Sequence, residues 1–280
     1  MAELTMLARG DLTREATMML QAAGIPDARR EASRLWRDLL TPTDETPSQG
    51  GGGLAARYRA CVRRRALGEP LAYVTGWTGF RHLVLTTDRR ALIPRPETEG
   101  LIPLAMHKVS SGTVADIGTG TGAIALSLAH EGRYDLVIGV DCSRPALELA
   151  RQNAARSGLT LRLVAGDLTS GLGDGMVDLL VSNPPYLAAE EMVALDPSVR
   201  DWEPALALAG GADGLEPYRR LFADGPRVLR PGGWIALEID ARRPEETAAL
   251  AVGSGWHDVT IHDDLFGRAR YLLARRETTQ

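Results

Sequence analysis

The chain has 280 residues, of which 44% are hydrophobic and 24% are charged, and its formal net charge is −4 at pH 7. This composition is typical of a globular protein, and the acidic balance argues against a nucleic-acid-binding tail or an extended basic groove. No apolar run approaches the ~18 residues that suggest a membrane span, so no membrane contact is expected.

The two cysteines, Cys61 and Cys142, lie far apart and outside any zinc-ligand or CxxC spacing. So few cysteines favour a protein of a reducing compartment. The N-terminal segment lacks the basic start and the apolar core of a signal peptide. We therefore expect a cytoplasmic protein without a metal site.

Residues 1–75 show helical patterns and are predicted to form a small helical domain. In "DARREASRLWRDLL" the apolar residues recur at helical spacing and form one stripe, made of Ala32, Leu35, Trp36, Leu39 and Leu40. A Pro/Ser/Gly stretch at 41–53 predicts a loop. A third helix follows, with Leu54, Tyr58, Cys61 and Val62 facing inward.

The outer side of this third helix carries a cluster of arginines, namely Arg57, Arg59, Arg63 and Arg64, with Arg65 nearby. A solvated helix face is the simpler interpretation of such a run. A docking surface for an acidic partner is the alternative, and the pattern does not separate the two.

Residues 76–95 are predicted to form a hairpin-like linker of short strands around a glycine-containing turn. Pro96, Glu97 and Glu99 then suit the first turn of a helix, where carboxylates meet the positive end of the helix dipole. The second domain is predicted to cover residues 96–280.

Beyond residue 112 the pattern alternates between strand and helix, which predicts a parallel sheet covered on both faces. The last two strands, "HDVTIHDD" and "RARYLLARR", are separated only by "LFG". That is too short for a crossover helix, so they must form an antiparallel hairpin. The predicted fold is α/β, the Rossmann-like sheet of class I S-adenosylmethionine-dependent methyltransferases ending in an antiparallel hairpin, preceded by the helical domain.

A glycine-rich loop, "DIGTGTGA", joins the first of these strands to its helix. Its glycines allow a tight turn and close approach to a ligand, and Asp141 at the tip of the next strand can accept hydrogen bonds from ribose hydroxyls. The loop alone also fits a dinucleotide fingerprint. The predicted cofactor-binding residues here are Gly118, Thr119, Gly120, Thr121, Gly122 and Asp141.

Three further features favour S-adenosylmethionine over NAD. Asp116 precedes the first glycine and suits the amino group of the ligand. Asp167, followed by Leu168, ends the third strand and suits the adenine amino group. "NPPY", residues 183–186, ends the fourth strand, at the edge where open α/β sheets bind ligands.

The Asn183-Pro184-Pro185-Tyr186 turn suggests methyl transfer to a planar NH2 group. Neither proline has an N–H, so the turn presents acceptors with few competing donors. The Asn183 side-chain oxygen and the Pro184 carbonyl can receive the two hydrogens of the NH2 group and aim its lone pair at a sulfonium methyl. Tyr186 can stack on the flat substrate.

We predict Asn183, Pro184 and Tyr186 as catalytic residues and all four residues of the turn as substrate-binding residues, with Asn183 also contacting the cofactor. The motif by itself permits adenine N6 or a carboxamide nitrogen.

The chain resembles the release factor glutamine methyltransferases over most of its length. The matching segments are "AGIPDARREASRLWRDLL", "GEPLAYVTGWTGFRHLVL", "LIPRPETEGLI", "VADIGTGTGAIALSLA", "VSNPPYL", "VRDWEPALALAGGADGLEPYRRL" and "LRPGGWIALEID". "IPRPETE" and "DWEPALALAGGADGL" are far more specific than the glycine loop or NPPY.

This resemblance implies methylation of N5 of the glutamine in the Gly-Gly-Gln loop of class I peptide chain release factors. It also implies that the N-terminal helical domain helps to hold that protein substrate. By resemblance, Gly118 to Gly122, Asp141 and Asn183 bind the cofactor, and Asn183 to Tyr186 bind the glutamine. No direct contact with nucleic acid is expected.

The sequence departs from the family at several positions. Leu168 stands where family members often carry an aromatic residue, "EIDARRPEE" lacks the usual glycine and glutamine, Ala269 stands where an acid is common, and the Gly50 to Gly53 run is peculiar to this chain. These positions bear on affinity or partner fit rather than on reaction class.

Other functions remain as alternatives. The runner-up is a nucleic-acid adenine-N6 methyltransferase, against which the acidic balance argues. A non-catalytic S-adenosylmethionine-binding interaction protein comes third, and a NAD-dependent oxidoreductase comes last.

Overall fold

The computed structural model describes residues 6–40 and 53–278 of the chain. The loop predicted at 41–53 lies, apart from Gly53, outside the described residues. Contacts divide the chain into two compact units, Met1–Trp77 with Asp196–Trp202, and Thr78–Leu195 with Glu203–Gln280. Within the described ranges, no helix is long and apolar enough to cross a membrane.

The first unit consists of helices packed around two aromatic residues. Its helices are α1 (Met6–Ala22), α2 (Ala28–Leu40), α3 (Leu54–Ala66), α4 (Leu71–Thr75) and α9 (Pro197–Arg200). Trp36 of α2 packs edge-on against Tyr58 of α3, with ring centroids 5.1 Å apart, and the Tyr58 hydroxyl donates to the Ala32 carbonyl at 2.9 Å. Ala32, Leu35 and Trp36 of the predicted stripe are therefore buried, whereas Leu39 is partly buried and Leu40, the last residue of the helix, is exposed.

Arg64 and Arg65 of α3 are tied to other parts of the first unit. Arg65 is buried, contrary to its expected place beside an outer cluster, and its Nε lies 2.6 Å from Glu31 Oε2. Arg64 binds Glu69 at 2.6 Å and also donates to the Tyr73 carbonyl at 3.0 Å. These two arginines hold α3 against its neighbours. Arg65 in particular needs its paired carboxylate, because its guanidinium is buried.

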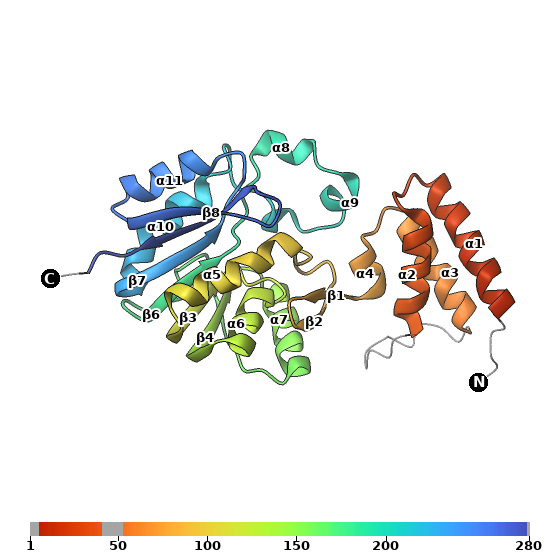
Figure 1. Ribbon diagram of the computed structural model, residues 1–280, viewed down its shortest axis with the longest axis horizontal. Helices are drawn as coiled ribbons and strands as arrows, with labels where there is room; N and C mark the ends of the chain where they lie inside the picture. The colour runs from red at the N-terminus through yellow and green to blue at the C-terminus, as the bar shows by residue number, and fades with distance from the viewer. Residues whose placement is uncertain (1–5, 41–52, 279–280) are drawn as a thin grey trace. The chain divides into compact units, whose positions relative to one another are not determined.

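The second unit contains a seven-stranded sheet with the strand order β5-β4-β3-β6-β7-β9-β8 (Figure 1). Its strands are β3 (Ser111–Ile117), β4 (Arg133–Asp141), β5 (Arg162–Ala165), β6 (Val177–Ser182), β7 (Leu229–Glu238), β8 (His257–Asp263) and β9 (Ala269–Arg275). The first five are parallel to one another, whereas β9 is antiparallel to both β7 and β8. The predicted fold class and terminal hairpin are confirmed.

Helices cover both faces of this sheet, which explains why its strands are apolar on both sides. Tyr218 and Phe222 pack with Ala115 on one face, while Ile102 and Ile124 pack with Val114 on the other. The helices of the second unit, whether or not they cover the sheet, are η1 (Pro96–Gly100), α5 (Leu101–Lys108), α6 (Ala123–Glu131), α7 (Arg144–Ser157), α8 (Ala189–Val193), η2 (Ala205–Ala207), α10 (Glu216–Val228) and α11 (Pro244–Gly253).

The short strands β1 (Trp77–Phe80) and β2 (Leu83–Thr86) form a separate two-stranded sheet. Phe80 and Leu85 are fully buried and pack with Leu126 of α6 and Ala154 of α7. Most of the predicted linker therefore packs on the second unit.

The strand order determines where a ligand can bind. The chain runs from β3 outward through β4 to β5 and then returns to β6, on the other side of β3. In open α/β sheets the crevice at such a reversal, beyond the carboxyl ends of the strands, is the ligand site. The glycine loop follows β3 and the NPPY turn follows β6, so the topology brings both to this crevice.

Candidate active site

The glycine loop turns sharply between β3 and α6. Gly122 precedes the first residue of α6 with φ of 83°, a left-handed conformation that favours glycine. A Cβ there would lie 3.4 Å from Ala150 Cβ, so the absence of a side chain also allows close packing of the loop on α7. The loop thereby directs its backbone toward the crevice.

Asp141, at the end of β4, is hydrogen-bonded to this loop. Its Oδ2 accepts from the Gly120 backbone N–H at 2.9 Å, and its Oδ1 accepts from the Ser143 N–H at 2.8 Å. Burial raises the pKa of Asp141, and the two backbone donors offset part of that rise. Each carboxylate oxygen has a second lone pair, so the group can still accept from two ribose hydroxyls.

A cavity of about 380 Å³ opens at this edge of the sheet. The predicted site residues that line it are Gly118, Gly120, Asp141, Asp167, Leu168, Asn183 and Pro185. Among the described residues, the lining does not include Asp116, Thr119, Thr121, Gly122, Pro184 or Tyr186. The structure thus brings the glycine loop, two strand-end carboxylates and the amide of Asn183 together around one space.

Asp116 lies beneath the loop and is fully buried. Its Oδ2 accepts from the Thr119 hydroxyl at 2.6 Å and from the Ala125 N–H at 3.1 Å, whereas its Oδ1 has no partner among the described residues. Burial raises the pKa of Asp116 to about 7. The structure shows Asp116 as an anchor of the glycine loop, and its contact with the cofactor's amino group stays a prediction.

Asp167 lies just beyond β5 and forms an ion pair that the sequence did not reveal. Its Oδ2 is 2.6 Å from Arg220 Nη2, and both residues line the cavity together with Leu168. Arg220 belongs to α10, where it reads as one of several polar residues on an amphipathic helix. Only the packing of α10 shows that it reaches the cavity.

Asn183, directly after β6, is held by a chain of hydrogen bonds. Its side-chain Nδ2 donates to the Thr98 hydroxyl oxygen at 3.1 Å, and the Thr98 hydroxyl donates to Glu238 Oε2 at 2.6 Å. Thr98 lies in "RPETE" and Glu238 in "WIALEID", two segments of the family resemblance, but no role was assigned to either residue. Both are buried.

The backbone of Tyr186 is packed against the "LALAGGADGL" segment. A Cβ on Gly210 would lie 2.7 Å from Tyr186 Cα, and Gly214 similarly contacts the Tyr186 carbonyl. Leu187 adds a pair of backbone hydrogen bonds, donating to Leu208 at 3.0 Å and accepting from Gly210 at 2.8 Å. These close contacts explain why glycines are needed in this segment.

The Tyr186 side chain is largely withdrawn from solvent, and its burial raises the pKa of the phenol. Its Oη lies 3.5 Å from Glu238 Oε1, too long for a strong O–H···O hydrogen bond. The ring therefore remains neutral, and packing rather than hydrogen bonding dominates its placement.

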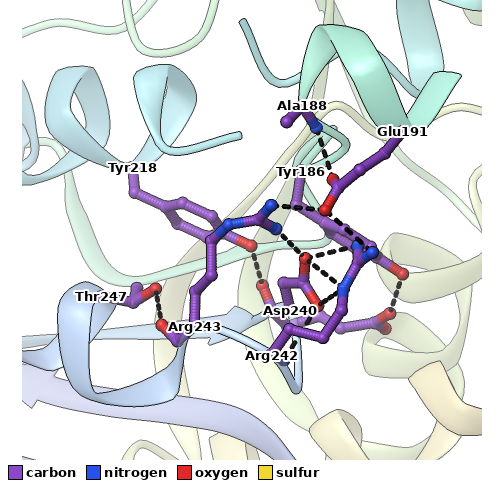
Figure 2. A network of polar contacts seen from close by, with 9 residues as sticks. Tyr186, Ala188, Glu191, Tyr218, Asp240, Arg242, Arg243 and Thr247 are labelled. Carbon is purple, nitrogen blue, oxygen red and sulfur yellow. Dashed lines mark hydrogen bonds and ion pairs between the residues drawn. The ribbon is translucent and has the colours of Figure 1, made fainter. Parts of the chain in front are cut away.

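A charged network holds the segment after Tyr186 to the end of β7 (Figure 2). Glu191 accepts from the Ala188 N–H at 2.7 Å and pairs with Arg242 at 2.8 Å and with Arg243. Arg242 and Arg243 both pair with Asp240 as well. This network occupies the positions where "EIDARRPEE" departs from the family. In this chain, charged pairs therefore fasten the segment after the NPPY turn to the end of β7.

Glu203, in "DWEP", is joined to the "IPRP" segment. It accepts from the Ile93 backbone N–H at 3.0 Å and pairs with Arg95 at 2.5 Å. The two most family-specific segments of the sequence therefore meet directly.

Comparisons with known proteins agree with this geometry. A family model for the "Methyltransferase small domain" matches residues 98–196. A release factor glutamine methyltransferase of Deinococcus radiodurans is 42% identical over 95% of this chain and 98% of its own length. A second protein of that name, from Cereibacter sphaeroides, is 41% identical over 95% of this chain and 97% of its own length.

A solved structure of a methyltransferase from Pyrococcus furiosus has the same fold, with a TM-score of 0.54 and 21% identity, covering 70% of this chain and 89% of that one. The sheet order, the glycine loop and the strand-end carboxylates fit S-adenosylmethionine as the cofactor. The chain is an S-adenosylmethionine-dependent methyltransferase, and it belongs to the release factor glutamine methyltransferase family.

Proposed function

We propose that this enzyme transfers a methyl group to N5 of the glutamine in the Gly-Gly-Gln loop of class I peptide chain release factors. Relatives named for that activity align with nearly the whole chain, including the N-terminal helices. We also propose that it works in the cytoplasm, where release factors act.

The orientation of the Asn183 amide is the observation that carries the proposal. Its NH2 group donates to Thr98, and its side-chain oxygen has no hydrogen-bond partner among the described residues. Asn183 also lines the cavity. An oxygen left without a partner in the described part of the chain, on a residue that lines the cavity, can accept from a substrate NH2 group, and this supports the proposal.

A carboxamide nitrogen is a poor nucleophile because its lone pair is delocalised into the carbonyl. We infer that the Asn183 oxygen and the Pro184 carbonyl accept its two hydrogens, favour a pyramidal nitrogen and aim the lone pair at the methyl group. Tyr186 packs against the flat amide. These residues position and polarise the substrate, and none of them acts as a general base.

The residues around the cavity fit the cofactor. Asp141 has lone pairs left for ribose hydroxyls, and the glycine loop has no side chains at Gly118 and Gly120, where the ligand approaches. When bound, S-adenosylmethionine supplies an electrophilic methyl group whose carbon–sulfur electron pair stays with sulfur. The methylated nitrogen then releases one proton to solvent.

The test is methylation with isotope-labelled S-adenosylmethionine, followed by mass spectrometry of the modified residue. The acceptors are a purified class I release factor, the same factor with Ala in place of the Gly-Gly-Gln glutamine, and DNA and RNA. We expect one added methyl group on that glutamine and no transfer to the other three acceptors. Label on adenine, or equal label on the Ala variant, would reject the proposal.

A further inference from the structure

We propose that Glu238 is a positioning residue that, through the hydroxyl of Thr98, determines which atom of the Asn183 amide faces the substrate. This inference rests on the proposed role of Asn183 as an acceptor and deepens it. It concerns residues to which neither the sequence motifs nor the comparisons assign a role.

The three residues come from separate elements of the second unit and meet at the carboxyl edge of the sheet. Thr98 lies in η1, Asn183 follows β6, and Glu238 ends β7. The Asn183–Thr98 distance is 3.1 Å and the Thr98–Glu238 distance is 2.6 Å. Glu238 is 1% exposed and Thr98 is 4% exposed, so water does not compete for these bonds.

The direction of the chain follows from what each group can donate. A carboxylate only accepts, so the single hydroxyl hydrogen of Thr98 must point at Glu238. The Thr98 oxygen then has only lone pairs for Asn183, which must present its NH2 group. The Asn183 oxygen is consequently left for the substrate. Without a charged acceptor at position 238, the hydroxyl can turn toward Asn183 and stabilise the opposite amide orientation.

The segment that carries Thr98 is anchored on both sides, which makes it a stable reference for the amide. The Tyr271 hydroxyl donates to the Glu97 carbonyl, and Gly100 leaves the space that the Tyr271 ring end occupies. On the other side, Glu99 accepts from the Arg81 backbone N–H at 3.0 Å. Rotation of the amide, rather than movement of η1, is therefore the motion that Glu238 must prevent.

The ionisation of Glu238 links this orientation to pH. Burial raises its pKa to about 7, against the opposing effects of the Thr98 hydroxyl and of Arg270 on β9. Glu97 on η1 raises it further, and the neutral phenols of Tyr186 and Tyr271 and the carboxylate of Asp240 lie nearby. As the pH falls through 7, Glu238 gains a proton and can donate to Thr98, so the fixed direction is lost.

The test compares single-turnover methylation by the parent, Glu238→Gln, Thr98→Val and Thr98→Ser, with cofactor affinity measured by calorimetry. We expect Glu238→Gln and Thr98→Val to lose about tenfold to hundredfold in rate, as misplacement of a reacting group does. Affinity for S-adenosylmethionine should stay within about twofold, and Thr98→Ser should recover most of the rate. Thr247→Val, which removes another buried hydroxyl, is the folding control.

Two further readouts separate positioning from a general structural role. In an Asn183→Ala background, Glu238→Gln should cause no additional loss, because both act through one amide. The parent rate should fall below pH about 7, whereas Glu238→Gln should lack that part of the profile. Asp116 also has a raised pKa, but this residue is unchanged in Glu238→Gln. Any fall in rate that is caused by protonation of Asp116 would therefore remain in the pH profile of the variant.

A parental rate in Glu238→Gln, or additive losses with Asn183→Ala, would overturn the inference. The parent's own product tests the proposed function separately. If the parent modifies a residue other than the glutamine, that proposal fails, and the same variants are then compared on the acceptor that is modified.

Discussion

The carboxylate of Asp141 accepts a hydrogen bond from the backbone N–H of Gly120 at 2.9 Å, so the residue predicted to bind ribose also fastens the glycine loop that lines the cavity. Asp141→Ala should therefore weaken S-adenosylmethionine binding by ~1.5–3 kcal/mol, the range for hydrogen bonds to a charged group. Calorimetry on the folded variant measures this. Unchanged affinity would remove Asp141 from the ribose role.

Asn183→Ala should lower kcat by about 10²-fold or more, with a smaller effect on KM, because it removes one preorganised acceptor while the Pro-Pro turn remains. Single-turnover rates on release factor provide the measurement. Methylation at the parental rate would contradict the acceptor mechanism.

Asn183→Asp is a sharper probe of the same site. The new carboxylate keeps an acceptor, but it loses the NH2 group that donates to Thr98. Two carboxylates would then compete for the one Thr98 hydroxyl hydrogen, and their charges repel. We expect a loss of activity at pH 8 that lessens as the pH is lowered. A pH-independent loss would show that Asn183 and Glu238 are not coupled.

Tyr186→Phe should cost much less than Tyr186→Ala. The Tyr186 hydroxyl is 3.5 Å from Glu238, so little hydrogen-bond energy is lost with it, whereas the ring is the part that we propose packs against the substrate amide. The comparison is the ratio of kcat/KM for the two variants at pH 8. Equal losses would assign the function to the hydroxyl instead.

Asp116→Asn should change how stability depends on pH. Burial raises the folded-state pKa of Asp116 from 3.8 to about 7, so between these values the folded protein binds a proton that the unfolded chain has released. The contribution of Asp116 is complete below pH about 4 and is lost as the pH rises through 7. In the Asp116→Asn variant the side chain at this position has no ionisable group, so this contribution to the pH dependence of stability is absent.

The stability of Asp116→Asn relative to the parent should therefore rise with pH across this window, by at most about 4 kcal/mol. Denaturant unfolding at pH 5 and pH 8, without cofactor, measures the difference, and the titration of Glu238 cancels because both proteins contain it. The same difference at both pH values would mean that Asp116 has an ordinary pKa.

Arg57 and Arg63 provide the cleanest test of the helical unit, since Arg64 and Arg65 hold α3 in place and Arg59 pairs with Glu15 at 3.1 Å. Changing both to Glu should leave folding and cofactor affinity intact, because Arg63 is exposed and Arg57 is only partly buried, and charges in contact with solvent contribute little to stability. A raised KM for release factor with a weaker salt dependence would support docking. An unchanged KM across a salt series would leave these arginines as a solvated face.

Local patterns were enough to predict the strand–helix alternation of the second unit and its terminal antiparallel hairpin. The three residues of "LFG" exclude a crossover, which determines that β8 and β9 are antiparallel. Ser143 and Gly158 mark the start and end of α7, where Ser143 accepts from the Ala146 N–H and Gly158 has φ of 65°. Because parallel strands end at one edge, Asp141, Asp167 and the NPPY turn were expected at the same edge of the sheet, and the cavity there is lined by Asp141, Asp167 and Asn183.

Contacts between distant segments were decided only by the tertiary structure. Thr98 and Glu238 are 140 positions apart, and neither residue type is unusual in its own segment. Arg220 reads as a polar helix position until the packing of α10 brings it to Asp167, and the full burial of Asp116 appears only once the sheet is assembled. The spacing of residue types along the chain indicates helices, strands and turns, because these depend on residues that are close together in the sequence. Hydrogen-bond partners and burial depend on which surfaces meet when the core closes, and that is set by the packing of the whole unit.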